Sequence, residues 1–404
     1  MGYKGGAPVE GAQDGIMGYK GGARARVVRW RVCYNAVMID LNGEEVVERL
    51  LAWWDEGHAS LPWRETADPY AIWVAEIMLQ QTQISTVIPY YARWLERFPT
   101  VMALAEASLD EVLKLWEGLG YYSRARYLHA AAKTVVAEHG GEVPQTVAEL
   151  RGLKGVGPYT AGAIASIAFE QPVPVVDGNV VRVLSRLVDL EADVTERETK
   201  KALWALAASL VPADRPGAFN QALMELGQRV CGPAAPACHQ CPLGTVCRAR
   251  QQGTQLERPV RPPRKRTPHF DVAAGVIWRD DGRFLIARRP LDGLLGGLWE
   301  FPGGKQDPGE TLAETLAREI QEELALQIAV GRRLVQIKHA YTHFRITLHA
   351  FHARYLAGEP QHLGVADHAW VTLADLEKYA FAVTDQKIIE ALRNGSSQLS
   401  LPLG

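Results

Sequence analysis

The sequence Leu153-Lys-Gly-Val-Gly-Pro-Tyr-Thr-Ala-Gly162 joins two stretches of helical patterning. Gly155 and Gly157 predict a tight turn between these helices, because only glycine adopts positive φ without steric cost. Successive backbone N–H groups in such a turn point outward and can bind an anion. The stretch therefore predicts a helical hairpin that grips a phosphate, with an ordinary loop as the simpler alternative.

Two acidic residues stand in apolar surroundings. Asp177 follows the apolar run that begins at Val173 and precedes a new helix start, so its carboxylate lies beside a helix N-terminus. Glu76 is the one carboxylate in the apolar helix predicted from Ile72 to Thr82. A buried carboxylate is costly unless it is paired, hydrogen-bonded or protonated. A structural ion pair would explain Glu76; the functional alternative is a general acid whose pKa is raised by burial.

Length and composition limit the class of protein. At 404 residues the chain is long enough for two or three domains, given about 150 residues per domain. A formal net charge of -2 confines any nucleic-acid-binding surface to a local patch. No apolar run reaches the roughly 18 residues of a membrane span, and the start lacks the layout of a signal peptide. We therefore expect a cytoplasmic protein with no membrane partner.

Four of the five cysteines are close together in a proline-rich loop. They are Cys231, Cys238, Cys241 and Cys247, with the spacing C-x6-C-x2-C-x5-C. Cysteines of a cytoplasmic protein are more often ligands than disulfide partners. Four such thiolates can hold one metal centre, and the spacing alone leaves zinc and an iron-sulfur cluster both open. Cys33 is left over as an ordinary thiol.

Changes in composition divide the chain into parts. A Gly-rich heptapeptide at Met1–Ala7 recurs at Met17–Ala23 and cannot bury a core, which predicts a disordered extension. Prolines and cations before residue 269 predict an extended linker, and a strand period beyond it predicts an α+β domain. The predicted parts are a disordered extension (1–38), a helical domain (39–250), a linker (251–268) and the α+β domain (269–398).

The α+β part contains an acidic motif. The motif reads Gly304-x5-Glu310-x7-Arg318-Glu-Ile-Gln-Glu-Glu-Leu-Ala-Leu326. It is similar to the Nudix box and differs only where Ala325 replaces the final glycine. Glu319 and Glu323 are one helical turn apart, and Glu322 lies beside them. These carboxylates are candidate Mg²⁺ ligands for a diphosphate substrate, although an ordinary charged helix face has similar spacing.

The helical hairpin, the Val-Asp-Gly-Asn segment and the four cysteines together resemble the helix-hairpin-helix DNA glycosylases of the endonuclease III group. Within that group they resemble the MutY-type adenine DNA glycosylases, from Leu41 to the end of the chain. The resemblance implies a mostly α-helical glycosylase domain whose cysteine loop holds a [4Fe-4S] cluster. It also implies that a Nudix-like α+β domain follows and recognises 8-oxoguanine.

The resemblance implies catalytic roles. Glu76 falls where the family has the acid that protonates adenine and then helps water attack. Asp177 falls where the family has the carboxylate that stabilises an oxocarbenium-like sugar, and Asn179 where a residue positions the water. Tyr159 replaces the lysine nucleophile of related bifunctional enzymes, and tyrosine cannot form the Schiff base that leads to strand cleavage. Base removal alone is therefore expected.

Binding residues are implied in the same way. Those of the pocket for the everted adenine are Trp63, Arg64 and Gln221. Those expected to contact DNA are Gln81, Thr82, Tyr121, Lys154, Gly155 and Gly157. Tyr121 lies in a glycine-containing loop, where a tyrosine packed into the protein is the alternative to a wedge in the base stack. The triplet Tyr341-Thr342-His343 stands where the family has an aromatic-serine-histidine loop for 8-oxoguanine, and threonine keeps the hydroxyl.

The implied function is hydrolysis of the N-glycosidic bond of adenine opposite 8-oxoguanine or guanine. The partner is double-stranded DNA, and we expect a monomer in the bacterial cytosol, associated with the nucleoid. One alternative is an additional Mg²⁺-dependent nucleotide pyrophosphohydrolase activity, which the nearly complete Nudix box favours. Another is a bifunctional glycosylase/lyase of the endonuclease III type, which Tyr159 disfavours.

Overall fold

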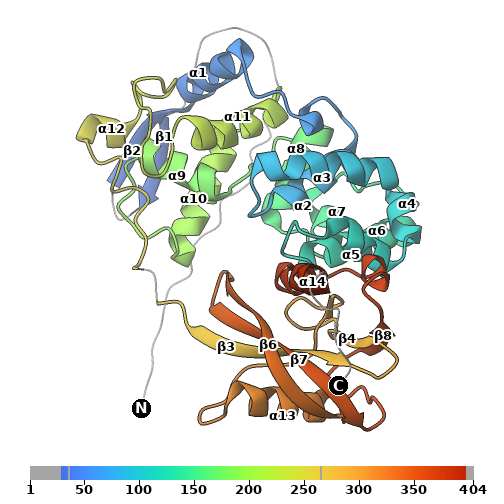
Figure 1. Cartoon of the computed structure of the whole chain (residues 1–404). Coiled ribbons are helices and arrows are strands. Elements are labelled where there is room, and N and C mark those ends of the chain that lie inside the picture. The colour runs from blue at the N-terminus through green and yellow to red at the C-terminus, as the bar shows by residue number, and fades with distance from the viewer. Residues whose placement is uncertain (1–28, 35–36, 264–265, 397–404) are drawn as a thin grey trace, which may run out of the picture.

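The computed structural model describes residues 29–34, 37–263 and 266–396. They form a helical part with two lobes and an α+β domain, drawn below the helices in Figure 1. This arrangement confirms the fold class predicted from the sequence. Within the described residues, no helix combines the length and the apolar character that crossing a membrane requires.

One helical lobe is a continuous segment of the chain. Its elements are η1 (Pro62–Arg64), α2 (Pro69–Leu79), α3 (Ile84–Arg97), α4 (Val101–Glu106), α5 (Leu109–Trp116), α6 (Ser123–His139), α7 (Val147–Leu150) and α8 (Pro158–Phe169). Helices α2 and α8 are apolar on nearly every side, and such helices must be surrounded by protein. They accordingly pack on each other at the centre of the lobe, within a core that includes the fully buried Trp73, Trp94 and Trp116.

The other lobe combines residues from before and after this segment. Its elements are β1 (Arg29–Tyr34), β2 (Val37–Asn42), α1 (Gly43–Glu56), α9 (Gly178–Leu187), α10 (Arg197–Leu210), α11 (Pro216–Arg229) and α12 (Arg248–Gln252). It has a core of its own, and α11 packs against both α9 of this lobe and α8 of the other. Helix α11 therefore closes the junction at which the candidate active site lies.

The predicted disordered extension differs from the structure at its end. Strands β1 and β2 pair antiparallel, with Arg29 opposite Asn42 and Tyr34 opposite Val37. This segment alternates apolar and polar residues and contains β-branched residues, which favour strands. The prediction was therefore wrong for residues 29–34 and 37–38. Residues 1–28 lie outside the described residues.

The helical hairpin joins α7 to α8 through residues 151–157. Gly155 has a φ of +82°, a conformation that favours glycine, and a Cβ there would lie 2.6 Å from the Tyr127 Cβ. Both the backbone conformation and the close approach of Tyr127 therefore require glycine. Gly157 differs from the prediction, because its φ is −86° and its conformation is extended. It is the N-cap of α8, and Pro158 follows at the first helical position.

The α+β domain is a mixed sheet between two helices. Its elements are β3 (His269–Trp278), β4 (Phe284–Arg288), β5 (Trp299–Glu300), α13 (Leu312–Leu324), β6 (Gln327–Ala340), β7 (Arg345–Ala357), β8 (Asp367–Val371), η2 (Asp375–Lys378) and α14 (Val383–Ser396). The strand order is β5-β4-β3-β7-β6, with β8 also paired to β4, and β3 runs parallel to β7. Helix α13 packs on one face of the sheet and α14 on the other.

The predicted linker is partly folded. Helix α12 extends into it as far as Gln252, and Val260 accepts a backbone hydrogen bond from Val194 (3.1 Å). Arg258 is 7% exposed, and its Nε lies 2.9 Å from a carboxylate oxygen of Asp189. Because Arg258 is buried and paired with a carboxylate of the helical part, this half of the linker packs on the helical lobe.

The α+β domain docks on α5 and α6. The Lys114 Nζ donates to the Tyr379 carbonyl (2.8 Å), and the Phe381 N–H donates to Glu117 (2.7 Å). Leu298 of the α+β domain belongs to the core of the adjacent helical lobe. These contacts hold the α+β domain against the helical lobe that contains α5.

Candidate active site

Helix α2 positions Glu76. Asp68 caps the helix by accepting a hydrogen bond from the Tyr70 N–H (3.0 Å), and Pro69 occupies the first position. Two turns on, Glu76 is 5% exposed, and burial raises its pKa to about 7. The Tyr159 hydroxyl, which comes from α8, donates to Glu76 Oε2 (2.7 Å) and opposes that rise. The carboxyl group is therefore able to exchange a proton near neutral pH.

Asp177 is the N-cap of α9. Its Oδ1 accepts a hydrogen bond from the Val180 N–H (2.7 Å), and its Oδ2 accepts one from the Asn179 side-chain amide (2.7 Å). Burial raises the pKa of Asp177, while these two hydrogen bonds lower it. The hydrogen bonds and the helix N-terminus favour the ionised form of Asp177, which burial alone would disfavour.

Arg182 connects this acid to the cysteine loop. It donates through Nη2 to Asn179 Oδ1 (2.8 Å) and through Nε to the Cys231 carbonyl (2.7 Å). Gly227 allows the close packing that this requires, because a Cβ there would lie 2.6 Å from the Asn179 Cβ. Arg182 was not predicted from the sequence, although its place about one turn after Asp177 on α9 could have indicated it.

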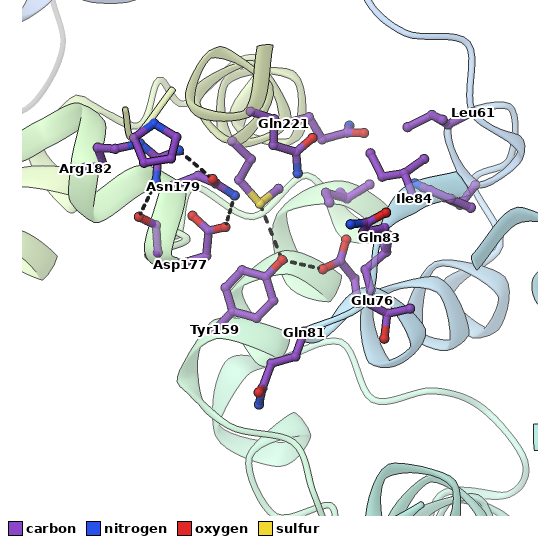
Figure 2. A pocket seen from close by; sticks show the side chains of 18 of the residues that line it. Leu61, Glu76, Gln81, Gln83, Ile84, Tyr159, Asp177, Asn179, Arg182 and Gln221 are labelled. Atoms are coloured by element: carbon purple, nitrogen blue, oxygen red, sulfur yellow. Dashed lines mark hydrogen bonds between the residues drawn. The ribbon is translucent and has the colours of Figure 1, made fainter. Parts of the chain in front are cut away.

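The structure brings the four predicted catalytic residues into one cavity of about 780 Å³ (Figure 2). Glu76 and Tyr159 reach it from one lobe, and Asp177 and Asn179 from the other. The same cavity is lined by the predicted adenine-pocket and DNA-contact residues Trp63, Arg64, Gln221, Gln81 and Thr82. Two acids a hundred positions apart in sequence thus face a common space.

The wall beside Glu76 is held by charge pairing that the sequence did not reveal. Arg64 is ion-paired with Glu225 of α11, and its guanidinium lies 4.8 Å from the Trp54 ring centroid. Glu225 is 2% exposed and also accepts a hydrogen bond from the Ala59 N–H (3.0 Å). Arg64 therefore presents a fixed cation to the cavity.

Arg124 is a second residue that the sequence analysis missed. Its acceptors are the carbonyls of Ile77, Met78, Gln80, Leu119 and Gly120 and the Thr82 hydroxyl, at 2.5 to 3.3 Å. The loops that it joins contain Gln81 and Tyr121, both with positive φ (58° and 47°). Positive φ is strained for residues other than glycine, so Arg124 stabilises the conformation of both predicted DNA contacts.

A second cavity of about 900 Å³ lies between the helices and the α+β domain. It is lined by Gln81, Tyr121, Lys154, Tyr341, Thr342 and His343. Tyr121 is 43% exposed, and its hydroxyl lies 2.9 Å from Thr342 Oγ1, whereas Tyr122 beside it is buried. The alternative that a tyrosine of this loop packs into the protein therefore holds for Tyr122 and not for Tyr121. The predicted DNA contacts and the predicted 8-oxoguanine residues line one surface.

The four cysteines form a compact loop that ends at α12, whose N-cap is Cys247. Burial and, to a smaller extent, the other three cysteines raise the pKa of the Cys241 thiol to about 12. Thiols that interact in this way are suited to deprotonation by a shared metal centre. Arg186 donates to Cys231 Sγ (3.3 Å), which would offset the negative charge of such a centre. The donor set therefore fits an iron-sulfur cluster.

Two of the three candidate Mg²⁺ ligands of the Nudix box are ion-paired with an arginine. Arg318 lies 3.1 Å from Glu319 and 3.1 Å from Glu322, and it also pairs with Glu310 (2.7 Å). In the part of the chain that the structure describes, these carboxylates are not among the side chains whose ligand atoms cluster within 4.8 Å. The ion pairs with Arg318 favour the ordinary charged-face alternative, and Mg²⁺ binding here stays a prediction.

Comparison with known proteins identifies both domains. Residues 74–209 match the family described as HhH-GPD superfamily base excision DNA repair protein, and residues 273–391 match the NUDIX domain. Among solved structures, a thermostable thymine-DNA glycosylase aligns with a TM-score of 0.48 at 30% identity, over 52% of this chain and 97% of that chain. The fold and the matched regions define a helix-hairpin-helix base excision repair protein with a Nudix domain.

Relatives along most of the chain make the assignment more particular. The adenine DNA glycosylase of Rattus norvegicus is 39% identical over 392 residues, which cover 84% of this chain and 76% of the rat protein. That of Homo sapiens is 38% identical and covers 84% and 72%, and that of Schizosaccharomyces pombe is 34% identical and covers 83% and 87%. The chain belongs to the adenine DNA glycosylase family, which confirms the resemblance seen in the sequence.

Proposed function

We propose that this chain hydrolyses the N-glycosidic bond of adenine in double-stranded DNA where adenine lies opposite 8-oxoguanine or guanine. The relatives bear the name adenine DNA glycosylase. The observation that carries the proposal is the shared cavity of Glu76 and Asp177, with Glu76 able to hold a proton near neutral pH. The glycosylase domain (39–250) performs the chemistry, and the Nudix-like domain (269–398) reads the opposite base.

Protonated Glu76 donates its proton to adenine while the bond between the base and the deoxyribose breaks. The base leaves as neutral adenine, and the positive charge that develops on the sugar is stabilised by the Asp177 carboxylate. Water then attacks the sugar and gives its proton to the Glu76 carboxylate, which restores the acid. Tyr159 offers a hydroxyl where a lyase would need an amine, so no Schiff base forms and the strand stays intact.

The second cavity is the proposed site for the base opposite adenine. Tyr121 and Thr342 come from different domains, and their hydroxyls are within hydrogen-bonding distance (2.9 Å), so a wedge residue and a recognition loop form one surface. Replacing Thr342 with valine removes one hydroxyl and keeps the shape. Thr342→Val is expected to reduce the preference for 8-oxoguanine over guanine about fivefold, since one hydrogen bond contributes about 1 kcal/mol. An unchanged preference would exclude Thr342 from recognition.

We assign a [4Fe-4S] cluster to Cys231, Cys238, Cys241 and Cys247. Bound there, the cluster holds the loop in place. The Cys231 carbonyl fixes Arg182, which in turn orients Asn179 beside Asp177. Iron analysis and absorption spectroscopy of the purified protein test the assignment; a protein with zinc in place of iron would contradict it.

Mg²⁺ at the Nudix box is a separate proposal. Glu323 Oε2 is buried without a hydrogen-bond partner, which leaves one carboxylate oxygen free for a cation. The full-length protein is incubated with Mg²⁺ and nucleoside triphosphates, and pyrophosphate release is measured. Turnover that Glu322→Gln abolishes would establish this second activity, and no turnover would eliminate it.

The main test uses duplexes that carry adenine opposite 8-oxoguanine, guanine or thymine. Abasic sites are expected with the first two duplexes and not with the third, and Asp177→Asn is expected to suppress them. Borohydride should trap no covalent adduct. We further propose that the protein acts as a monomer at the nucleoid in the bacterial cytosol, which sedimentation analysis with and without DNA can test.

A further inference from the structure

A pair of histidines faces an aspartate at one edge of the Nudix-like domain, far along the chain from the catalytic residues. His362 lies in the loop 358–366 between β7 and β8, and Asp367 and His368 begin β8. His362 Nε2 lies 2.8 Å from His368 Nδ1, and Asp367 Oδ1 lies 4.0 Å from His362 Nε2. The ligand atoms of all three side chains lie within 4.8 Å of one another.

The backbone on both sides of His362 is fixed. The N–H groups of Gln361, Leu363 and Gly364 donate to the carbonyls of Leu324 and Glu323 at 2.9 to 3.1 Å. These carbonyls belong to the last turn of α13 and have no partner within the helix, so the loop caps α13. After His362, the Ala366 N–H donates to the Arg288 carbonyl of β4 (2.8 Å). The loop therefore holds His362 in place beside a strand.

His368 is fixed in the same way by the sheet. It is opposite Ala287 in the antiparallel pair of β8 and β4. The Asp367 carboxylate accepts a hydrogen bond from the His368 N–H (2.8 Å), which orients it without using a histidine ring. At 4.0 Å the carboxylate is too far from the His362 ring for a direct hydrogen bond. The three ligand atoms therefore lie within 4.8 Å of one another, and of the side-chain pairs only the two imidazole rings are within hydrogen-bonding distance.

We propose that His362, Asp367 and His368 bind a divalent transition-metal ion, with Zn²⁺ the best match. Two imidazoles and a carboxylate are a donor set for zinc, with water in the fourth position, and imidazole nitrogens are poor ligands for Mg²⁺. Tetrahedral zinc places two imidazole nitrogens about 3.3 Å apart, a small movement from the present separation. The His362 and Asp367 side chains are 43% and 52% exposed, so an ion can enter. The bound ion would link the loop 358–366 to β8.

Equilibrium dialysis of the full-length protein against ZnCl₂, followed by elemental analysis, tests the proposal. The double variant His362→Gln, His368→Gln is expected to retain about one zinc ion fewer per chain than the unaltered protein. Zinc held by the cysteine loop is the same in both proteins, so only the difference counts. His139→Gln, at the end of α6, is the matched control and should match the unaltered protein. Equal zinc in the double variant and the unaltered protein would overturn the proposal.

A second measurement needs no variant. Diethyl pyrocarbonate modifies accessible imidazoles, and mass spectrometry locates the modified residues. Zinc is expected to protect His362 and His368 and leave His139 reactive, whereas a tenfold excess of Mg²⁺ should protect none of them. If zinc left His362 and His368 as reactive as before, the three side chains would be an ordinary hydrogen-bonded surface group, and the inference would fail.

Discussion

Glu76→Gln is expected to slow adenine excision strongly and, above neutral pH, to stabilise the fold. Glutamine keeps the shape and can still accept the hydrogen bond from Tyr159. The variant loses the proton that the mechanism needs, a loss of about 10²- to 10⁴-fold in excision rate. Burial raises the pKa of Glu76 from its ordinary 4.5 to about 7. At about 1.4 kcal/mol per pKa unit, ionising this group in the folded protein costs about 3 kcal/mol.

The sign of the stability effect follows from proton binding. Between pH 4.5 and 7 the unfolded chain releases the Glu76 proton and the folded chain keeps it. Stability from this group is therefore fully present below pH 4.5 and lost as the pH rises through about 7. Glutamine does not titrate. As the pH rises across that range, the free energy of unfolding of the variant therefore increases by about 3 kcal/mol relative to that of the unaltered protein.

Urea unfolding of both proteins at several pH values between 4.5 and 8 measures this difference, and single-turnover excision from an adenine:8-oxoguanine duplex measures activity. All other titrating groups are shared, so the difference isolates Glu76. Glu56→Gln, an exposed glutamate on α1, is the control and should follow the unaltered protein. A difference between Glu76→Gln and the unaltered protein that stays constant with pH would refute the argument that Glu76 is buried and protonated. Retained activity would refute its role as the acid.

Other predictions follow from the neighbouring contacts. Tyr159→Phe removes a hydrogen bond that lowers the pKa of Glu76; the high-pH limb of the excision rate should move up by about one pH unit, and an unmoved limb would contradict the contact. Arg124→Met leaves buried carbonyls unpaired. A fall of about 3 kcal/mol in the free energy of unfolding is expected, together with weaker DNA binding. Unchanged stability in urea would contradict the role of Arg124 in holding the two loops. Cys241→Ser should lose iron and bind duplex DNA more weakly, as gel-shift titration can show; full iron content would contradict the ligand assignment.

Much of the fold is local and was predictable. The apolar helix predicted from Ile72 to Thr82 forms as α2, with the bounds Pro69–Leu79. The strand period predicted beyond the linker forms the sheet of the α+β domain, because alternating residues bury one face of each strand. The hairpin turn required glycine at Gly155, where φ is positive, but not at Gly157. The positions of the two acids were visible as well, since each interrupts an apolar run.

The sequence alone determined the residue types, the spacing of the cysteines and the two-domain order. Only the tertiary structure decided which of these residues meet. Helix α2 is apolar on nearly every face, so no period could show that Glu76 faces Tyr159 and a cavity shared with Asp177. All but one of the hydrogen-bond partners given for Arg124 are backbone carbonyls, which carry no sequence signal. Contacts between distant segments depend on how whole helices and sheets pack, and that packing is not encoded in any short stretch of the chain.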